Sequence, residues 1–206
     1  MLLHVIANPR GDDESRSKRI ARAFLEGFSE ANPGAEIREI DLYAVDLPMT
    51  DAKDANTRLH QARGDLNPAE QKRLDRFCTF IDPLLACDRL LITTPMWNFG
   101  PTWKLKQWID TVVQARITFE YTPNGPKGLL NAKGALVGSR GGAYPDDKDP
   151  RESGDFLVPY LTHVMKWIGI KDVRTCFADA VDAKKDQAEA YLRECEAKAR
   201  ELGKTF

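Results

Sequence analysis

Short apolar runs alternate along the chain with longer stretches in which apolar residues recur at helical spacing. Five runs are too short for helices and are typical of strands buried on both faces: residues 2–7, 36–42, 88–94, 134–138 and 173–178. Amphipathic stretches between and after them predict helices at about 18–31, 68–86, 101–116, 155–169 and 184–202. Residues 43–66 are polar without a clear period, and we expect them to cross the surface as an irregular excursion.

This strict strand–helix alternation predicts an α/β fold with a parallel sheet covered on both faces. Five strands favour the flavodoxin-like, doubly wound order 2-1-3-4-5 over a six-stranded dinucleotide fold. No internal repeat, low-complexity stretch or linker interrupts the pattern. We therefore expect residues 1–206 to form one flavodoxin-like domain with three layers, α/β/α.

Composition and charge narrow the function classes. Lys and Arg total 30 and Asp and Glu total 31, so nothing favours nucleic acid or an anionic membrane as a partner. The first residues do not resemble a signal peptide, and no apolar run approaches the ~18 residues of a membrane span. The four cysteines form no CxxC pair, which speaks against a zinc site and indicates buried thiols. A cytoplasmic protein without a metal is expected.

The segment after the first strand, NPRGDDESRS (residues 8–17), has the features of a phosphate site. A helix N-terminus with free N–H groups, serine hydroxyls and Arg10 can all bind a phosphate. Neither GxGxxG nor GxxxxGK[ST] is present, so a monophosphate fits better than a pyrophosphate or a triphosphate. Ser15 could instead be only the N-cap of the helix.

Two further segments follow strands whose carboxyl ends meet at the same edge of the sheet. Pro95–Pro101 is rigid and aromatic and suits a flat heterocycle, although its aromatics could equally pack into the core. Ser139–Gly142 brings consecutive glycines that allow close backbone approach and direct N–H groups at an acceptor; the alternative is a flexible turn.

Taken together, NPRGDDESRS, PMWNFGPTWKLKQWID (95–110), FEYTPNGPKGLL (119–130) and SRGG (139–142) resemble the FMN-dependent NADH:quinone oxidoreductases known as azoreductases. The similarity extends over essentially the whole chain. It implies a homodimer with one non-covalent FMN per subunit at the interface. It also implies ping-pong hydride transfer through flavin N5, from NADH or NADPH to quinones or azo compounds.

The resemblance assigns cofactor contacts residue by residue. Arg10, Ser15 and Ser17 would hold the phosphate, and Asn8, where the family commonly has serine, would make a weaker contact. Pro95, Met96, Trp97, Asn98 and Phe99 would line one edge of the ring, with the Asn98 backbone near N5, and Ser139, Arg140, Gly141 and Gly142 would hold the pyrimidine edge.

The substrate side is less defined. Tyr121 matches a family aromatic near the interface, and Tyr160, His163 and Trp167 are further candidates to face the ring. No obligatory acid–base side chain is expected, because the flavin carries the chemistry and water can supply protons; His163 is a weak catalytic candidate.

Other histidines and tryptophans have simpler interpretations. His4 is expected in the core, His60 in solvent, and Trp103 and Trp108 in core or dimer packing. The charged helix at 184–202 is expected to be a solvated face with i,i+4 ion pairs. A flavodoxin-like electron carrier, or a non-catalytic sensor on the same fold, remains an alternative function.

Overall fold

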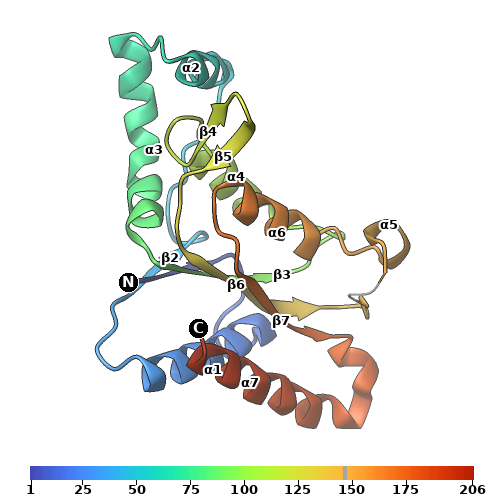
Figure 1. The fold of residues 1–206 in the computed structure, drawn as a ribbon. Helices are drawn as coiled ribbons and strands as arrows, with labels where there is room; N and C mark the ends of the chain where they lie inside the picture. Colours follow the sequence, from blue (N-terminus) through green and yellow to red (C-terminus); the bar gives the residue numbers. More distant parts are fainter. Residues whose placement is uncertain (146–147) are drawn as a thin grey trace.

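A five-stranded parallel sheet forms the centre of the computed structural model, which describes residues 1–145 and 148–206 (Figure 1). Its strands are β1 (Leu2–Ile6), β2 (Ile37–Asp41), β3 (Arg89–Pro95), β6 (Lys133–Arg140) and β7 (Val173–Asp179). Their order across the sheet is β2-β1-β3-β6-β7, which is the predicted flavodoxin-like order. The register is regular, with Val5 opposite both Ile40 and Ile92.

Successive strand residues point into two separate hydrophobic cores, because side chains alternate between the faces of a sheet. Leu3 and Val5 belong to the core shared with α3 (Pro68–Ala86), α4 (Trp103–Val112) and α6 (Val158–Trp167). Leu2 belongs to the core shared with α1 (Arg16–Ala31) and α7 (Ala188–Lys204). The two helix layers lie on opposite sides of the sheet in Figure 1. The predicted helices are therefore confirmed, with ends shifted by a few residues.

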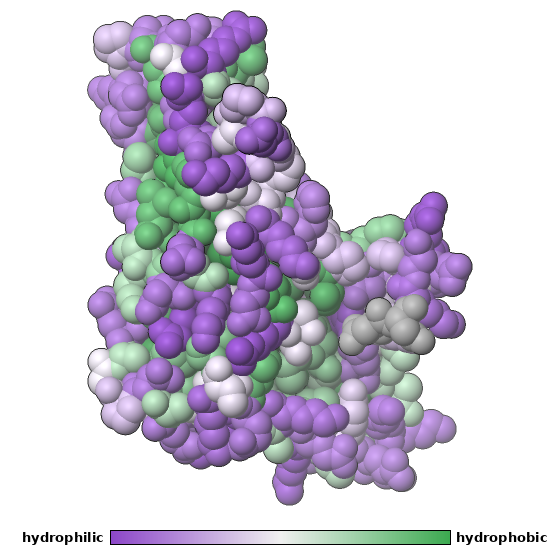
Figure 2. Space-filling view, in the orientation of Figure 1, coloured by the Kyte–Doolittle hydropathy of each residue, from purple (hydrophilic) through white to green (hydrophobic). Residues whose placement is uncertain are grey.

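The α1–α7 pair corrects the expectation of a merely solvated terminal helix. A Cβ on Gly27 would lie 2.0 Å from the Arg200 carbonyl oxygen, so the two backbones are in direct contact. Arg19 of α1 also binds Glu189 and Glu196 of α7. Only the outer side of α7 is solvated, in keeping with the mostly hydrophilic lower surface in Figure 2. The apolar band in the same view lies along α3, on the other side of the sheet. Before α7 runs a 3₁₀ segment, η1 (Val181–Gln187).

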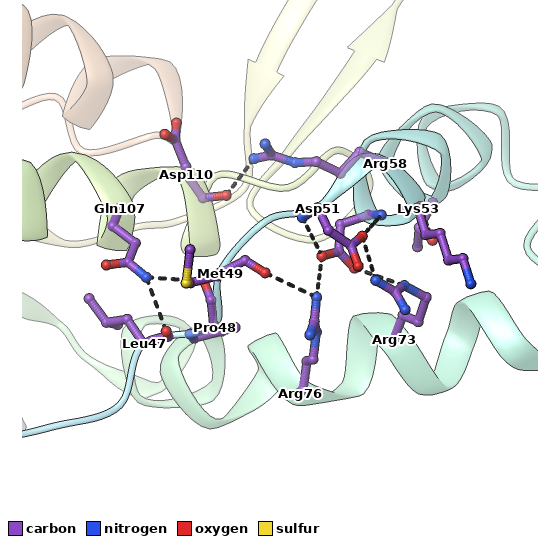
Figure 3. Close-up of polar contacts among 12 residues, drawn as sticks. Leu47, Pro48, Met49, Asp51, Lys53, Arg58, Arg73, Arg76, Gln107 and Asp110 are labelled. Carbon is purple, nitrogen blue, oxygen red and sulfur yellow. Dashed lines mark hydrogen bonds and ion pairs between the residues drawn. The ribbon is translucent and has the colours of Figure 1, made fainter.

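The expected irregular excursion at 43–66 was wrong, because it contains helix α2 (Ala52–Arg63). Asp51 caps this helix in a capping box with Asp54. The buried stripe of α2 is polar, comprising Asp54, Thr57 and Gln61, and hydrophobic periodicity therefore does not report it. The fully buried Asp54 carboxylate binds Arg73 (Nε–Oδ1 2.9 Å) and Arg76 of α3. Figure 3 shows the two arginines extending from α3. Arg58 joins the same helix to the Asp110 carbonyl of α4.

Smaller elements were not predicted. An antiparallel hairpin, β4 (Phe119–Thr122) and β5 (Gly125–Gly128), follows α4, and the short helix α5 (Pro150–Ser153) precedes α6. None of the helices in the described ranges combines the length and the apolar character needed to cross a bilayer.

Single residues expected to be structural have mixed outcomes. His4 is buried between Glu39 and Thr93, each 2.8 Å away, as expected of a core histidine. His60 is not simply solvated, because its Nδ1 bonds Glu70. Trp108 is buried, whereas Trp103 is 61% exposed and lies outside the core. All four cysteines are free thiols, and each is buried or half-buried.

Candidate active site at the carboxyl edge of the sheet

The three predicted segments converge on one cavity beyond the carboxyl ends of β1, β3 and β6, which are neighbours in the sheet. The cavity has a volume of about 160 Å³. It is lined by Asn8, Arg10, Ser15, Arg16, Pro95, Met96, Trp97, Ser139, Arg140, Gly141 and Asp182. Arg10 and Gly141, which are 131 residues apart in the chain, thus share one site.

The corner after β1 is held by a buried amide. Asn8 donates from Nδ2 to Ser15 Oγ over 2.7 Å and accepts at Oδ1 from the Arg10 N–H over 3.0 Å. Ser15 is the N-cap of α1, since its Oγ also accepts from the Lys18 N–H. An oxygen that already accepts twice can still donate its own proton. No described residue accepts that proton, so Ser15 is both a cap and a free donor beside the cavity.

Ser17 lies behind this corner rather than in the cavity wall. It is fully buried, and its Oγ is 3.0 Å from Ser139 Oγ. This contact ties the first turn of α1 to the end of β6. Because one hydroxyl of the pair donates to the other, the second proton remains for another acceptor.

Of the two arginines at this corner, one is paired with a carboxylate and the other is not. Arg16 binds both carboxylate oxygens of Asp182, at 3.0 and 2.5 Å, and this contact lowers the pKa of Asp182. Arg10 is exposed and forms no ion pair with a described residue. The corner thus offers one uncommitted cation. The sequence motifs missed Arg16 and Asp182; Asp182 belongs to the loop after β7, the next strand along the sheet edge.

The segment after β3 forms a tight turn. Trp97 and Gly100 exchange two backbone hydrogen bonds of 3.1 and 3.0 Å. Asn98 and Phe99 between them have φ of 47° and 69°, a left-handed conformation that is uncommon for residues with a side chain. Trp97 and Phe99 are 40% and 59% exposed, so the turn presents its aromatics outward and not to the core. Neither Asn98 nor Phe99 lines the 160 Å³ cavity itself.

The segment after β6 presents backbone to the cavity and turns its one long side chain away. A Cβ on Gly141 would meet nothing within 4 Å, so the space in front of it is open. The Arg140 side chain is 5% exposed, and its guanidinium binds Asp155 and Asp179 over 2.5–2.7 Å. Arg140 therefore joins β6 to β7 and to the start of α6.

The four aromatic and histidine candidates for the substrate side lie away from this cavity. Tyr121 packs edge-on against Phe119, which also contacts Trp167, and His163 lies beside Trp167. Tyr160 is half-buried near α4, where burial raises its pKa. None of the four lines the cavity of its own chain.

Comparison with known proteins agrees with this arrangement. A family model described as having a flavodoxin-like fold matches residues 1–202. The FMN-dependent NADH:quinone oxidoreductase of Nitratidesulfovibrio vulgaris is 35% identical over 208 residues, covering 100% of this chain and 99% of that protein. The chain belongs to the FMN-dependent NADH:quinone oxidoreductase family. A second member, from Staphylococcus haemolyticus, is 34% identical over 100% of this chain and 99% of its own.

Solved structures extend the family likeness to three dimensions. An azoreductase from Bacillus anthracis str. Sterne matches with a TM-score of 0.88 at 29% identity, covering 100% of this chain and 99% of that one. An FMN-dependent NADH-azoreductase from Bacillus anthracis str. Ames Ancestor, solved in complex with FMN, matches with a TM-score of 0.85 at 26% identity, covering 99% and 98%. The resemblance found in the sequence motifs is thereby confirmed.

Proposed function

We propose that this protein is an FMN-dependent NAD(P)H oxidoreductase that reduces quinones and aromatic azo compounds. The observation that carries the proposal is the convergence of Ser15, Met96 and Gly141 on one cavity at the switch point of the sheet. Family membership supports the same activity, since the relatives are named for it.

The chemistry of the cavity wall fits the phosphate end of FMN. Its uncommitted polar groups are donors: the Ser15 hydroxyl, the first N–H groups of α1 and the Arg10 guanidinium. Its one carboxylate, Asp182, is already paired with Arg16 and would repel a phosphate less than a free carboxylate would. In this proposal Ser17 supports the site from behind, through Ser139.

The flavin ring of FMN needs more space than the cavity provides. At about 160 Å³ the cavity is smaller than the ~300–1,000 Å³ usual for whole ligands, so it would enclose the phosphate and part of the chain that follows. The flavin ring would lie outside it, between the Pro95–Phe99 turn and the open backbone at Gly141. Arg140 would contribute there through its backbone, because its side chain is engaged elsewhere.

A second copy of the chain would complete the site. The exposed Trp97 and Phe99 leave the ring position uncovered in one subunit. Tyr121 and His163 are exposed and do not line the proposed flavin cavity of their own chain, which makes them the best candidates to cover the ring of a partner. Tyr160 and Trp167 are half-buried and would serve chiefly to support them.

The chemistry that bound FMN would supply is ping-pong hydride transfer through N5, from NADH or NADPH to the second substrate. The chain's own part is binding and orientation. N–H groups of the Gly141–Gly142 backbone would stabilise negative charge that develops on the pyrimidine edge. The apolar Met96 and Trp97 would exclude water from one side of the ring.

The visible spectrum of the purified protein tests the proposal. We expect flavin absorption that bleaches anaerobically with NADH and returns when a quinone is added. A protein that takes up no FMN would overturn it. A flavin that NADH reduces but that only another protein reoxidises would favour an electron carrier instead.

A further inference from the structure

A second cavity lies at the opposite edge of the sheet, where β3, β6 and β7 begin. Its volume is about 800 Å³, within the range of small-molecule sites. Asp88 and Arg89 form one side, the segment 126–133 a second, and the turn after α6, with Gly169 and Asp172, a third. No residue of this cavity lines the proposed flavin site.

The walls of this cavity are fixed backbone to backbone. A Cβ on Gly128 would lie 2.1 Å from the Gly169 nitrogen, so only glycine permits this approach. Next to it the Leu130 N–H donates to the Ile168 carbonyl over 2.9 Å. The Lys133 N–H binds the Asp88 carbonyl over 3.0 Å. The cavity is therefore part of the folded framework and not a gap between loose loops.

Positive charge dominates the lining although the whole chain carries a net charge of only −1. The cationic residues are Arg89, Lys127, Lys133, Lys166 and Lys171. The two carboxylates are already neutralised, Asp88 by the Met1 ammonium at 2.9 Å and Asp172 by Arg174 at 3.5 Å. Lys133, Lys166 and Lys171 form no ion pair with any residue in the described part of the chain. Among the described residues, these three lysines therefore have no carboxylate partner.

Among these cationic residues, Arg89 is held in a fixed position by contacts on several sides. Its side chain is 27% exposed and is held from three sides. Nε donates to the Phe206 carbonyl oxygen over 3.0 Å, Nη1 donates to Asp88 over 2.9 Å, and the guanidinium lies 5.5 Å from the Phe28 ring centre. Nη2 has no acceptor among the described residues, so this lining residue keeps one unsatisfied donor in a side chain that is already held in place.

We infer that this cavity binds a compact, multiply phosphorylated anion. Several phosphate oxygens would meet the uncommitted Lys133, Lys166 and Lys171 ammonium groups and the Arg89 Nη2. The described lining contains no aromatic side chain on which a base could stack, which favours a pyrophosphate or a sugar bisphosphate over a nucleotide.

Calorimetric titration of the flavin-loaded protein with inorganic pyrophosphate tests the inference, because FMN then blocks the proposed phosphate corner. The double variant Lys133→Gln/Lys171→Gln removes two cavity charges. Lys53→Gln/Lys72→Gln removes two exposed charges on α2 and α3 that form no ion pair with a described residue, and it matches the net charge of the cavity variant. We expect one site per chain, weakened at least about fivefold in the cavity variant and unchanged in the control.

Equal affinities in the two variants, or no saturable binding, would overturn the inference. Binding of heparin that pyrophosphate fails to displace would also overturn it, by assigning the charge to a polymer. The flavin absorbance of the same samples reports the proposed function separately. If the protein takes up no flavin, the two variants are compared without it.

Discussion

Replacing Arg140 with methionine tests how much the buried charge network that holds the Ser139–Gly142 segment contributes to stability. The guanidinium donates to Asp155 Oδ2 over 2.5 Å and to both oxygens of Asp179 over 2.7 Å each. The side chains of Arg140, Asp155 and Asp179 are 5, 9 and 20% exposed. Methionine preserves much of the apolar stem but leaves two largely buried carboxylates without their cation.

The expected loss of stability depends on the hydrogen bonds that the two carboxylates keep. Removing one partner of a buried ion pair destabilises a protein by about 3–5 kcal/mol. Asp155 Oδ1 keeps two backbone donors, from Leu157 and Val158, so the lower end of that range applies. For a chain of this size, about 3 kcal/mol corresponds to a decrease in Tm of roughly 6–12 °C.

Urea and thermal unfolding of Arg140→Met measure this loss, and the triple variant Arg140→Met/Asp155→Asn/Asp179→Asn is the matched control. Neutral amides tolerate the missing cation, so the triple variant should recover a large part of the stability. FMN affinity should also decrease in Arg140→Met, because the segment proposed to face the ring loses its anchor. A loss below about 1 kcal/mol, or a triple variant no more stable than the single one, would refute the reasoning.

Three further predictions address the cofactor corner, the α1–α7 contact and the thiols. Ser15→Asp keeps an N-cap but places a negative charge beside the phosphate, so FMN should bind at least about tenfold more weakly than to the unmodified protein. Ser15→Asn is a neutral N-cap and should bind FMN much more tightly than Ser15→Asp does. Equal affinities of the two variants would contradict the phosphate site. Gly27→Ala should lower the free energy of unfolding by about 1–3 kcal/mol, although helix propensity alone predicts a gain, because the new Cβ would lie 2.0 Å from the Arg200 carbonyl oxygen; a raised Tm would count against this contact. Burial raises the pKa of Cys87 and Cys176 from 9.0 to about 11. The unfolded chain therefore loses these protons at lower pH than the folded one, so the free energy of unfolding should decrease as pH rises from about 9 to 11. Alkylation of the two thiols at neutral pH should be slow, and rapid labelling of the folded protein would disprove this protection.

The central sheet could be predicted because its signal is local. Strands buried on both faces need continuous apolar runs, such as Leu2–Ile6, and the helices that cover them need one apolar stripe. The alternation of the two fixes the topology almost completely. Glycine-rich and proline-rich segments at strand ends then identified the edge where the cavity forms.

Features that depend on contacts between distant residues could not be predicted in this way. Helix α2 buries Asp54 against arginines of α3 and Gln61 against the Ala115 carbonyl beyond α4, so its buried stripe is polar. The side chain of Arg140, expected at the cofactor, faces Asp155 and Asp179, and no local pattern reports that pairing.

The pair formed by Arg16 and Asp182 illustrates the same limit within the site. The two residues are 166 positions apart, and only the parallel order of β1, β3, β6 and β7 brings the loop after β7 towards the start of α1. The candidates Tyr121 and His163 do not line the cavity of their own chain, so the role proposed for them requires a second subunit, which sequence periodicity does not describe.

Comparing the affinities of FMN and riboflavin for the flavin-free protein tests most directly whether the segments after β1, β3 and β6 form a flavin cradle with a phosphate corner. The two ligands share the ring and differ in the phosphate, so FMN should bind the unmodified protein far more tightly, and Ser15→Asp should remove most of that difference. Equal binding of the two flavins, or a preference that survives in Ser15→Asp, would contradict the account.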